Sequence, residues 1–105
     1  DVYKRQILTT MYLDLKRNDS LKKIYSFLKK YYKNHKFIKI LKPNTFLGTN
    51  EVINTNNCYI SVCESKYKNK IIILSAIDNL IKGGSGQAVQ NMNILFGYKS
   101  DEGLN

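Results

Sequence analysis

The pattern of hydrophobic and polar positions predicts a strand followed by a helix in the first third of the chain. From Ile7 to Leu15 the sequence is rich in β-branched, aromatic and alternating apolar residues, which predicts a strand. The polar run at 18–20 can then cap a helix at its start. One apolar face follows at helical spacing, formed by Leu21, Ile24, Tyr25, Leu28 and Tyr32.

The rest of the chain predicts three more strands and a terminal helix. Residues 37–41 read as a short strand, and residues 43–57 as a polar, irregular connection. Residues 58–63 and 71–77 read as two strands of an antiparallel hairpin. A helix is expected after residue 86. The order β-α-β-β-β-α therefore predicts an α+β fold with a mixed or antiparallel sheet and packed helices.

Positive charge is concentrated in the first part of the chain. The formal charge is +9, and residues 1–42 hold 12 basic and 3 acidic side chains. A basic half of this kind allows a small nucleic-acid-binding module as an alternative function. However, the chain has 15 lysines and 2 arginines, and arginine supplies the bidentate contacts that read bases and phosphates. We therefore interpret the lysines of the first helix as a solvated face and expect no nucleic-acid partner.

Length and cysteine content narrow the class of protein further. A chain of 105 residues fits one domain or part of one. Its longest uninterrupted apolar run is residues 71–74, whereas a membrane-spanning helix needs about 20 apolar residues. Cys58 and Cys63 lack the spacing of a zinc site or disulfide scaffold. We expect reduced thiols, no metal, no membrane contact and a cytoplasmic location.

The strongest local chemical signal is the glycine-rich turn at 82–86 and the helix after it. Glycines let a ligand approach the backbone closely, although the spacing matches neither a Walker A loop nor GxGxxG. Gln87, Gln90 and Asn91 share one helical face, and amides suit recognition of another carboxamide such as a nicotinamide. Residues 83–98 carry no charge, so we expect this helix to be buried against something, with Gly97 at its end.

Residues 75–97 read SAIDNLIKGGSGQAVQNMNILFG, and this run resembles the C-terminal segment of the N-acetyl-γ-glutamyl-phosphate reductase family, within the semialdehyde dehydrogenases. That family shows the pattern (S/A)-x-(I/V)-D-N-L-x-K-G-x-x-G-Q-A-x-Q-N-M-N near its end. The runs at 7–12, 37–41 and 57–62 are also similar and fall in the expected order. The resemblance covers most of residues 5–104, and the run at 75–97 is its specific part.

The resemblance implies a longer two-domain enzyme of which this chain is the C-terminal part. Residues 1–6 would be a non-native leader, residues 7–82 the end of the catalytic and dimerisation domain, and residues 83–105 the helix and tail that return to a missing NADP-binding domain. The enzyme would form a homo-oligomer. It would reduce a small acyl phosphate, N-acetylglutamyl 5-phosphate, to the semialdehyde through a cysteine thioester. The fragment alone is expected to be inactive.

The same resemblance assigns the site residues. Those expected to contact NADP are Gly84, Ser85, Gln87, Gln90 and Asn91. Lys82 could position an anion at the turn. Asp78 and Asn79 would hold the turn through side-chain-to-backbone hydrogen bonds. Arg5 is a weak candidate for substrate binding, because Gln6 stands where the family has glycine.

No catalytic residue is expected within the chain, because the family's nucleophilic cysteine and catalytic histidine would lie upstream. Cys58 lacks the Pro-Gly that precedes the family's nucleophile and falls in a predicted strand. His35 does not match the family's histidine element and reads as a surface or capping residue. Two enzyme alternatives remain within the superfamily, namely dehydrogenases that act on aminoadipyl or aspartyl substrates.

Overall fold

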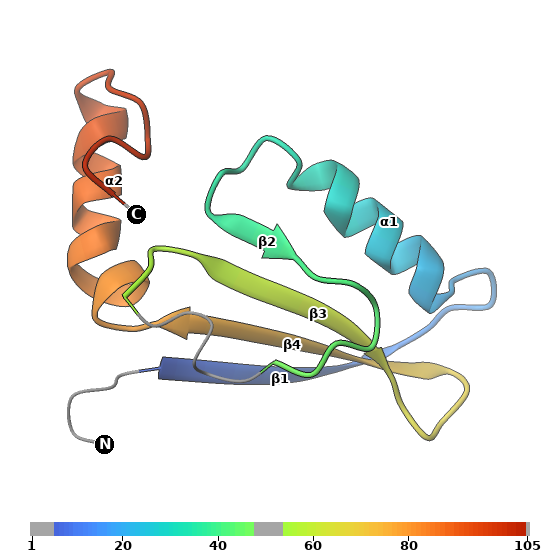
Figure 1. The fold of residues 1–105 in the computed structure, drawn as a ribbon. Coiled ribbons are helices and arrows are strands. Elements are labelled where there is room, and N and C mark those ends of the chain that lie inside the picture. The colour runs from blue at the N-terminus through green and yellow to red at the C-terminus, as the bar shows by residue number, and fades with distance from the viewer. Residues whose placement is uncertain (1–5, 48–53, 105) are drawn as a thin grey trace.

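The structure describes residues 6–47 and 54–104, which form a four-stranded sheet with one helix over it and another at its end (Figure 1). In this computed structural model the strands are β1 (Gln6–Asp14), β2 (Ile38–Ile40), β3 (Cys58–Glu64) and β4 (Lys70–Asp78). The helical elements are α1 (Leu21–Tyr31), the π-helical turn η2 (Ile81–Ser85) and α2 (Gly86–Leu95). The predicted α+β class and order of elements are confirmed.

The strands lie in the order β1-β4-β3-β2, so the last strand of the chain is an inner strand of the sheet. β3 and β4 pair antiparallel, with Cys58 opposite Ile77 and Glu64 opposite Ile71, which confirms the predicted hairpin. β1 pairs antiparallel with the other side of β4, and β2 pairs parallel with β3. The sheet is therefore mixed, and its two inner strands are the hairpin.

Helix α1 begins where the sequence predicts and covers one face of the sheet. The Ser20 hydroxyl accepts a hydrogen bond from the backbone N–H of Lys23 at 3.2 Å, which caps the first turn. The apolar face of α1 packs against β3 and β4, while its lysines are exposed. The cluster that these elements form consists of Leu15, Leu21, Ile24, Leu28, Ile60, Val62, Ile71 and Ile73.

The opposite face of the sheet is covered in part by the segment that follows β2. Leu47 packs against Ala76, which has no exposed surface. Asn44 has a φ of 64°, a left-handed conformation that asparagine tolerates, and its side chain accepts a hydrogen bond from the Glu64 backbone at 2.8 Å. The Ser61 hydroxyl donates to the Thr45 carbonyl. The described first part of the predicted irregular connection, residues 43–47, therefore closes the second core over β3 and β4.

Strand β1 leaves apolar side chains in solvent on both faces of the sheet. Ile7, Met11 and Leu13 are 41%, 43% and 39% exposed, and Leu8 and Tyr12 on the other face are 46% and 71% exposed. No strand among the described residues pairs with its outer edge. A long edge strand whose only charged residue is Asp14 at its end is a template for pairing or packing against another surface.

The glycine-rich segment, predicted as a turn that leads into a helix, is itself helical. The chain enters η2 three residues after β4 ends, and the backbone N–H of Ser85 donates to the Leu80 carbonyl at 3.1 Å. Gly84 alone leaves helical geometry inside η2, with φ −139° and ψ −110°. The helical hydrogen bonds thus take up N–H groups that an isolated helix start would offer to a ligand. Gly97, with φ 77°, ends α2 as predicted.

Helix α2 stands at the end of the sheet where β4 finishes, and it packs mainly on η2 (Figure 1). The sequence predicts a buried helix, but Ile94, Leu95 and Phe96 are 61%, 79% and 67% exposed. The expectation of burial is therefore not met within the described residues. None of the helices described here has the length and apolar character needed to cross a membrane.

Candidate functional site at the junction of β4 and α2

Asp78 fixes the exit from β4, as the resemblance implies. Its side chain is 4% exposed and accepts two backbone hydrogen bonds, from Leu80 at 2.9 Å and from Asn54 at 2.7 Å. Asn54 follows the undescribed residues 48–53 and has a φ of 60°. The carboxylate therefore joins residues 54–57, the connector before β3, to the start of η2.

Two glycines in η2 and α2 lie in close contact with other groups. A Cβ added at Gly86 would lie 2.5 Å from the Asn56 Oδ1 and 2.6 Å from the Ile81 carbonyl oxygen. A Cβ at Gly83 would lie 2.0 Å from the Asn79 Oδ1, so Asn79 packs against the turn. Gly86 is buried between the helix and the connector, which explains glycine there by space and not by φ.

The residues assigned to NADP by resemblance divide into two groups. Gly84, Ser85 and Asn91 are exposed and Gln87 is half-buried, so a ligand can reach this group. The Gln87 Nε2 donates to the Asn91 Oδ1 at 3.4 Å, which confirms that these two amides share one face. Gln90 instead uses its side-chain oxygen within the molecule.

The Gln90 Oε1 accepts hydrogen bonds from two donors that approach from different elements. The Lys82 Nζ lies 2.8 Å away, and the Asn56 Nδ2 lies 3.0 Å away. Asn56 has no exposed surface, and its Oδ1 has no hydrogen-bond partner among the described residues. The Lys82 Nζ also lies 5.3 Å from the centre of the Phe37 ring. These contacts tie α2 to η2 and to the connector before β3.

Burial lowers the pKa of the Lys82 ammonium, and the nearby Cys58 acts weakly in the opposite direction. Sequence reasoning named Lys82 and Gln90 but missed Asn56. Asn56 lies in a stretch with asparagine at 50, 54, 56 and 57, and nothing local distinguishes it from its neighbours. Its role depends on a partner 34 positions away.

Cys58 and His35 lie where the sequence places them. Cys58 is the first residue of β3, and its Sγ lies 3.4 Å from the Ser75 Oγ. His35 is exposed beyond the end of α1, where its ring stacks on Tyr31 and meets Tyr32 edge-on. Arg5 lies outside the described residues. Among the residues that are described, no cluster of histidine, cysteine and carboxylate side chains could hold a metal ion.

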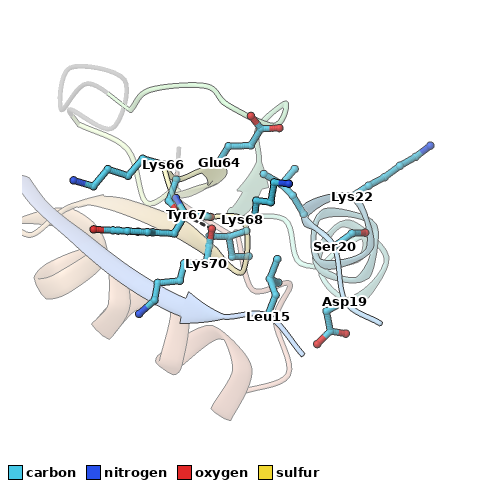
Figure 2. Close-up of a pocket in the computed structure, with 12 residues that line it drawn as sticks. Leu15, Asp19, Ser20, Lys22, Glu64, Lys66, Tyr67, Lys68 and Lys70 are labelled. Carbon is cyan, nitrogen blue, oxygen red and sulfur yellow. Dashed lines mark hydrogen bonds between the residues drawn. The ribbon is translucent and has the colours of Figure 1, made fainter. Parts of the chain in front are cut away.

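A hollow of about 530 Å³ lies at the other end of the sheet, between the start of α1 and the turn from β3 to β4 (Figure 2). Its walls mix charges of both signs, with Asp19 and Glu64 beside the lysines of the turn. Figure 2 shows Lys22 and Lys66 extending away from one another. None of the residues assigned by resemblance lines this hollow.

Comparison with known proteins agrees with the resemblance. A family model described as the semialdehyde dehydrogenase dimerisation domain matches residues 2–79. A Thermoanaerobacter pseudethanolicus protein named N-acetyl-gamma-glutamyl-phosphate reductase is 46% identical over 100 residues, which cover 95% of this chain and 29% of the relative. Proteins of the same name from Vesicomyosocius okutanii and Methanosphaera stadtmanae are 48% and 43% identical over 100 and 101 residues, covering 95% of this chain in each case and 27% and 30% of the relatives.

The chain thus spans less than a third of the length of these relatives. The family model ends at residue 79, immediately before η2 and α2, whereas the similarity to the relatives covers nearly the whole chain. Its match includes all four strands and α1. The chain therefore belongs to the semialdehyde dehydrogenase dimerisation-domain family.

Proposed function

We propose that the chain is the C-terminal part of an NADP-dependent reductase of arginine biosynthesis. Its substrate would be N-acetylglutamyl 5-phosphate, and its products the semialdehyde and phosphate. The observation that carries this proposal is the similarity to reductases of that name over 95% of the chain, which extends past the dimerisation domain into α2. The protein would act in the cytoplasm as a homo-oligomer.

The position of α2 supports the proposed division of the chain at residues 82 and 83. The dimerisation match stops at residue 79, and α2 packs mainly on η2. The outer side of α2 is apolar, with Leu95 and Phe96 largely exposed. A helix of this kind gains stability by packing on another lobe. We assign that lobe to the coenzyme-binding domain that would precede this chain.

The amides of α2 fit a carboxamide ligand. Because the Gln87 Nε2 donates to the Asn91 Oδ1, the Gln87 Oε1 and the Asn91 Nδ2 remain available. One acceptor and one donor match the amino group and the carbonyl oxygen of a nicotinamide. Gly84 and Ser85 are exposed beside them, whereas Gln90 serves the internal network. The reduced coenzyme, NADPH, would supply the hydride, and these residues would orient its carboxamide end.

The described residues hold no candidate nucleophile that matches the proposed thioester chemistry. Cys63 is 4% exposed, and Cys58 lies in a strand beside Ser75. A cysteine nucleophile needs a neighbouring base or an electropositive, accessible setting. The thioester-forming cysteine and its histidine would therefore come from the upstream part of the enzyme, and this chain alone would not turn over substrate.

A chimaera tests the proposal directly. Residues 7–105 replace the matching segment of the Thermoanaerobacter pseudethanolicus relative, and the rate of NADPH consumption with N-acetylglutamyl phosphate is measured. Turnover is expected, and Gln87→Ala and Asn91→Ala should raise the KM for NADPH more than Ser26→Ala on the exposed face of α1. A chimaera that folds and assembles yet does not reduce this substrate would contradict the proposal.

The alternatives predict different outcomes. A preference for an aminoadipyl or aspartyl phosphate would identify a different dehydrogenase of the superfamily. Sequence-selective binding of duplex DNA or RNA by the 105-residue chain, with an affinity that falls steeply with salt, would favour a nucleic-acid module. Weak binding that does not depend on sequence would reflect only the net charge of +9.

A further inference from the structure

A cavity of about 330 Å³ lies between the end of α1 and the inner side of α2, separate from the hollow of Figure 2. Three residues that can carry positive charge line it, and none of its lining residues is a carboxylate. The residues that matter for its chemistry are His35, Lys36, Phe37, Lys82, Gln90 and Ser100. A concave, basic wall of this kind suits an anion.

Lys82 supplies the positive charge that would attract an anion into the cavity. Its ammonium is held by the Gln90 Oε1 at 2.8 Å and by the face of the buried Phe37 ring. Both partners are uncharged, and no carboxylate among the described residues forms an ion pair with Lys82. Burial without a counter-ion lowers its pKa, which is the behaviour of a cation that lacks an anionic partner.

Lys36 already has a carboxylate partner, because it forms an ion pair with Asp101. Of the two lysines that line the cavity, Lys82 is therefore the one without a carboxylate partner among the described residues. Gln90 adds a neutral donor, since its Oε1 is occupied by Lys82 and Asn56 while its Nε2 makes no hydrogen bond to the described residues. Ser100 lines the same cavity, and its hydroxyl can donate as well.

We infer that this cavity binds a phosphoryl anion, with Lys82 as the charged partner and Gln90 and Ser100 as neutral hydrogen-bond donors. Charge-assisted hydrogen bonds from an ammonium and amide donors fit the oxygens of a phosphate. Asn56 acts as a positioning residue, because it holds the Gln90 oxygen from a fully buried site. The inference rests on the described residues of this chain and does not require the reductase activity.

The test is a titration of the ¹⁵N-labelled 105-residue chain with inorganic phosphate at constant ionic strength, followed by amide chemical shifts. Saturable shifts are expected at Lys82, Gln90 and Ser100. Lys82→Met should weaken binding about tenfold, or ~1.4 kcal/mol. Lys68→Met, which removes one exposed lysine at the other end of the sheet, should leave the affinity unchanged. Lys82→Gln removes the charge but keeps a donor for Gln90, and it should weaken binding as Lys82→Met does.

Shifts that do not saturate, that centre on the lysines of α1, or that decline equally in Lys82→Met and Lys68→Met would overturn the inference. Two further arms distinguish the source of the phosphoryl group. Competition by NADP but not NAD would assign the site to the coenzyme's extra phosphate, and competition by acetyl phosphate would assign it to an acyl phosphate or its product. Phosphate binding with an inactive chimaera would separate failure of the proposed reductase from failure of this site.

Discussion

The Nδ2 of Asn56 lies 3.0 Å from the Oε1 of Gln90 and joins the connector before β3 to the middle of α2. Asn56 is fully buried, so its loss would remove a shielded hydrogen bond and leave space behind. We expect Asn56→Ala to lower the free energy of unfolding by about 1–3 kcal/mol. Amide exchange in α2 should rise at the same time. Asn91→Ala, at an exposed position of the same helix, is the control and should change stability by less than about 0.5 kcal/mol in urea titrations.

Gly86 provides a test of close packing. Gly86→Ala would place a methyl group 2.6 Å from the Ile81 carbonyl oxygen, which belongs to the backbone and cannot rotate away. We expect a loss of about 1–3 kcal/mol in stability. Gly83→Ala meets the exposed Asn79 side chain, which can turn aside, and it should cost less. Equal losses by calorimetry would show that the backbone contact is not the cause.

The start of α1 depends on one hydroxyl. Ser20→Ala removes the acceptor for the Lys23 N–H, and we expect it to destabilise the chain by about 1 kcal/mol. Ser26→Ala replaces an exposed serine inside the same helix, where alanine has the higher helix propensity. Its effect should be neutral or slightly stabilising. Thermal unfolding followed by circular dichroism measures both, and a similar loss in the two variants would contradict the cap.

Lys36 and Asp101 form an ion pair across 65 positions. The hydrogen bond from Lys36 lowers the pKa of the Asp101 carboxyl, and Lys99 adds a smaller effect in the same direction. A carboxyl with a lowered pKa stabilises the fold above its unfolded pKa, and this contribution disappears as pH falls through the folded value. In a carboxyl NMR titration, Lys36→Gln should raise the Asp101 pKa more than Lys99→Gln does. A larger rise with Lys99→Gln would reject the assigned cause.

The exposed strand β1 predicts self-association. The match to the dimerisation-domain family model includes this strand, and Met11 on the strand is 43% exposed. Met11→Lys places a charge on that apolar surface and should shift the chain toward monomer in sedimentation velocity, with little effect on its fold. Ser26→Lys adds the same charge to the exposed face of α1 and should leave association unchanged. An identical response of the two variants would place the contact elsewhere.

Local patterns in the sequence were sufficient to predict most of the helices and strands. The Ser20 cap, the apolar face of α1 and the end of α2 at Gly97 each depend on residues within a few positions of one another. Strand order depends on distant pairing instead, and neither the parallel pairing of β2 with β3 nor the place of β1 beside β4 follows from periodicity.

The candidate site was predictable only where its residues are consecutive. The run from Lys82 to Asn91 is visible as a motif, and the amide pair of Gln87 and Asn91 follows from helical spacing. The π-helical geometry of η2 was not predictable from local sequence. It depends on tertiary contacts at the end of β4, where Asp78 bonds the Leu80 backbone and Asn56 packs against Gly86. The role of Asn56 follows only from its tertiary contact with Gln90.

Helix α2 is attached to the rest of the chain through η2 and polar contacts, and little of its apolar surface is shielded. Detaching it would therefore uncover little additional hydrocarbon, so the denaturant dependence of that opening would be shallow and its heat-capacity change small. The sheet, by contrast, can open only by uncovering Val62 and Ile71. We therefore expect α2 to open before the sheet does, and the two parts to report separate free energies of opening.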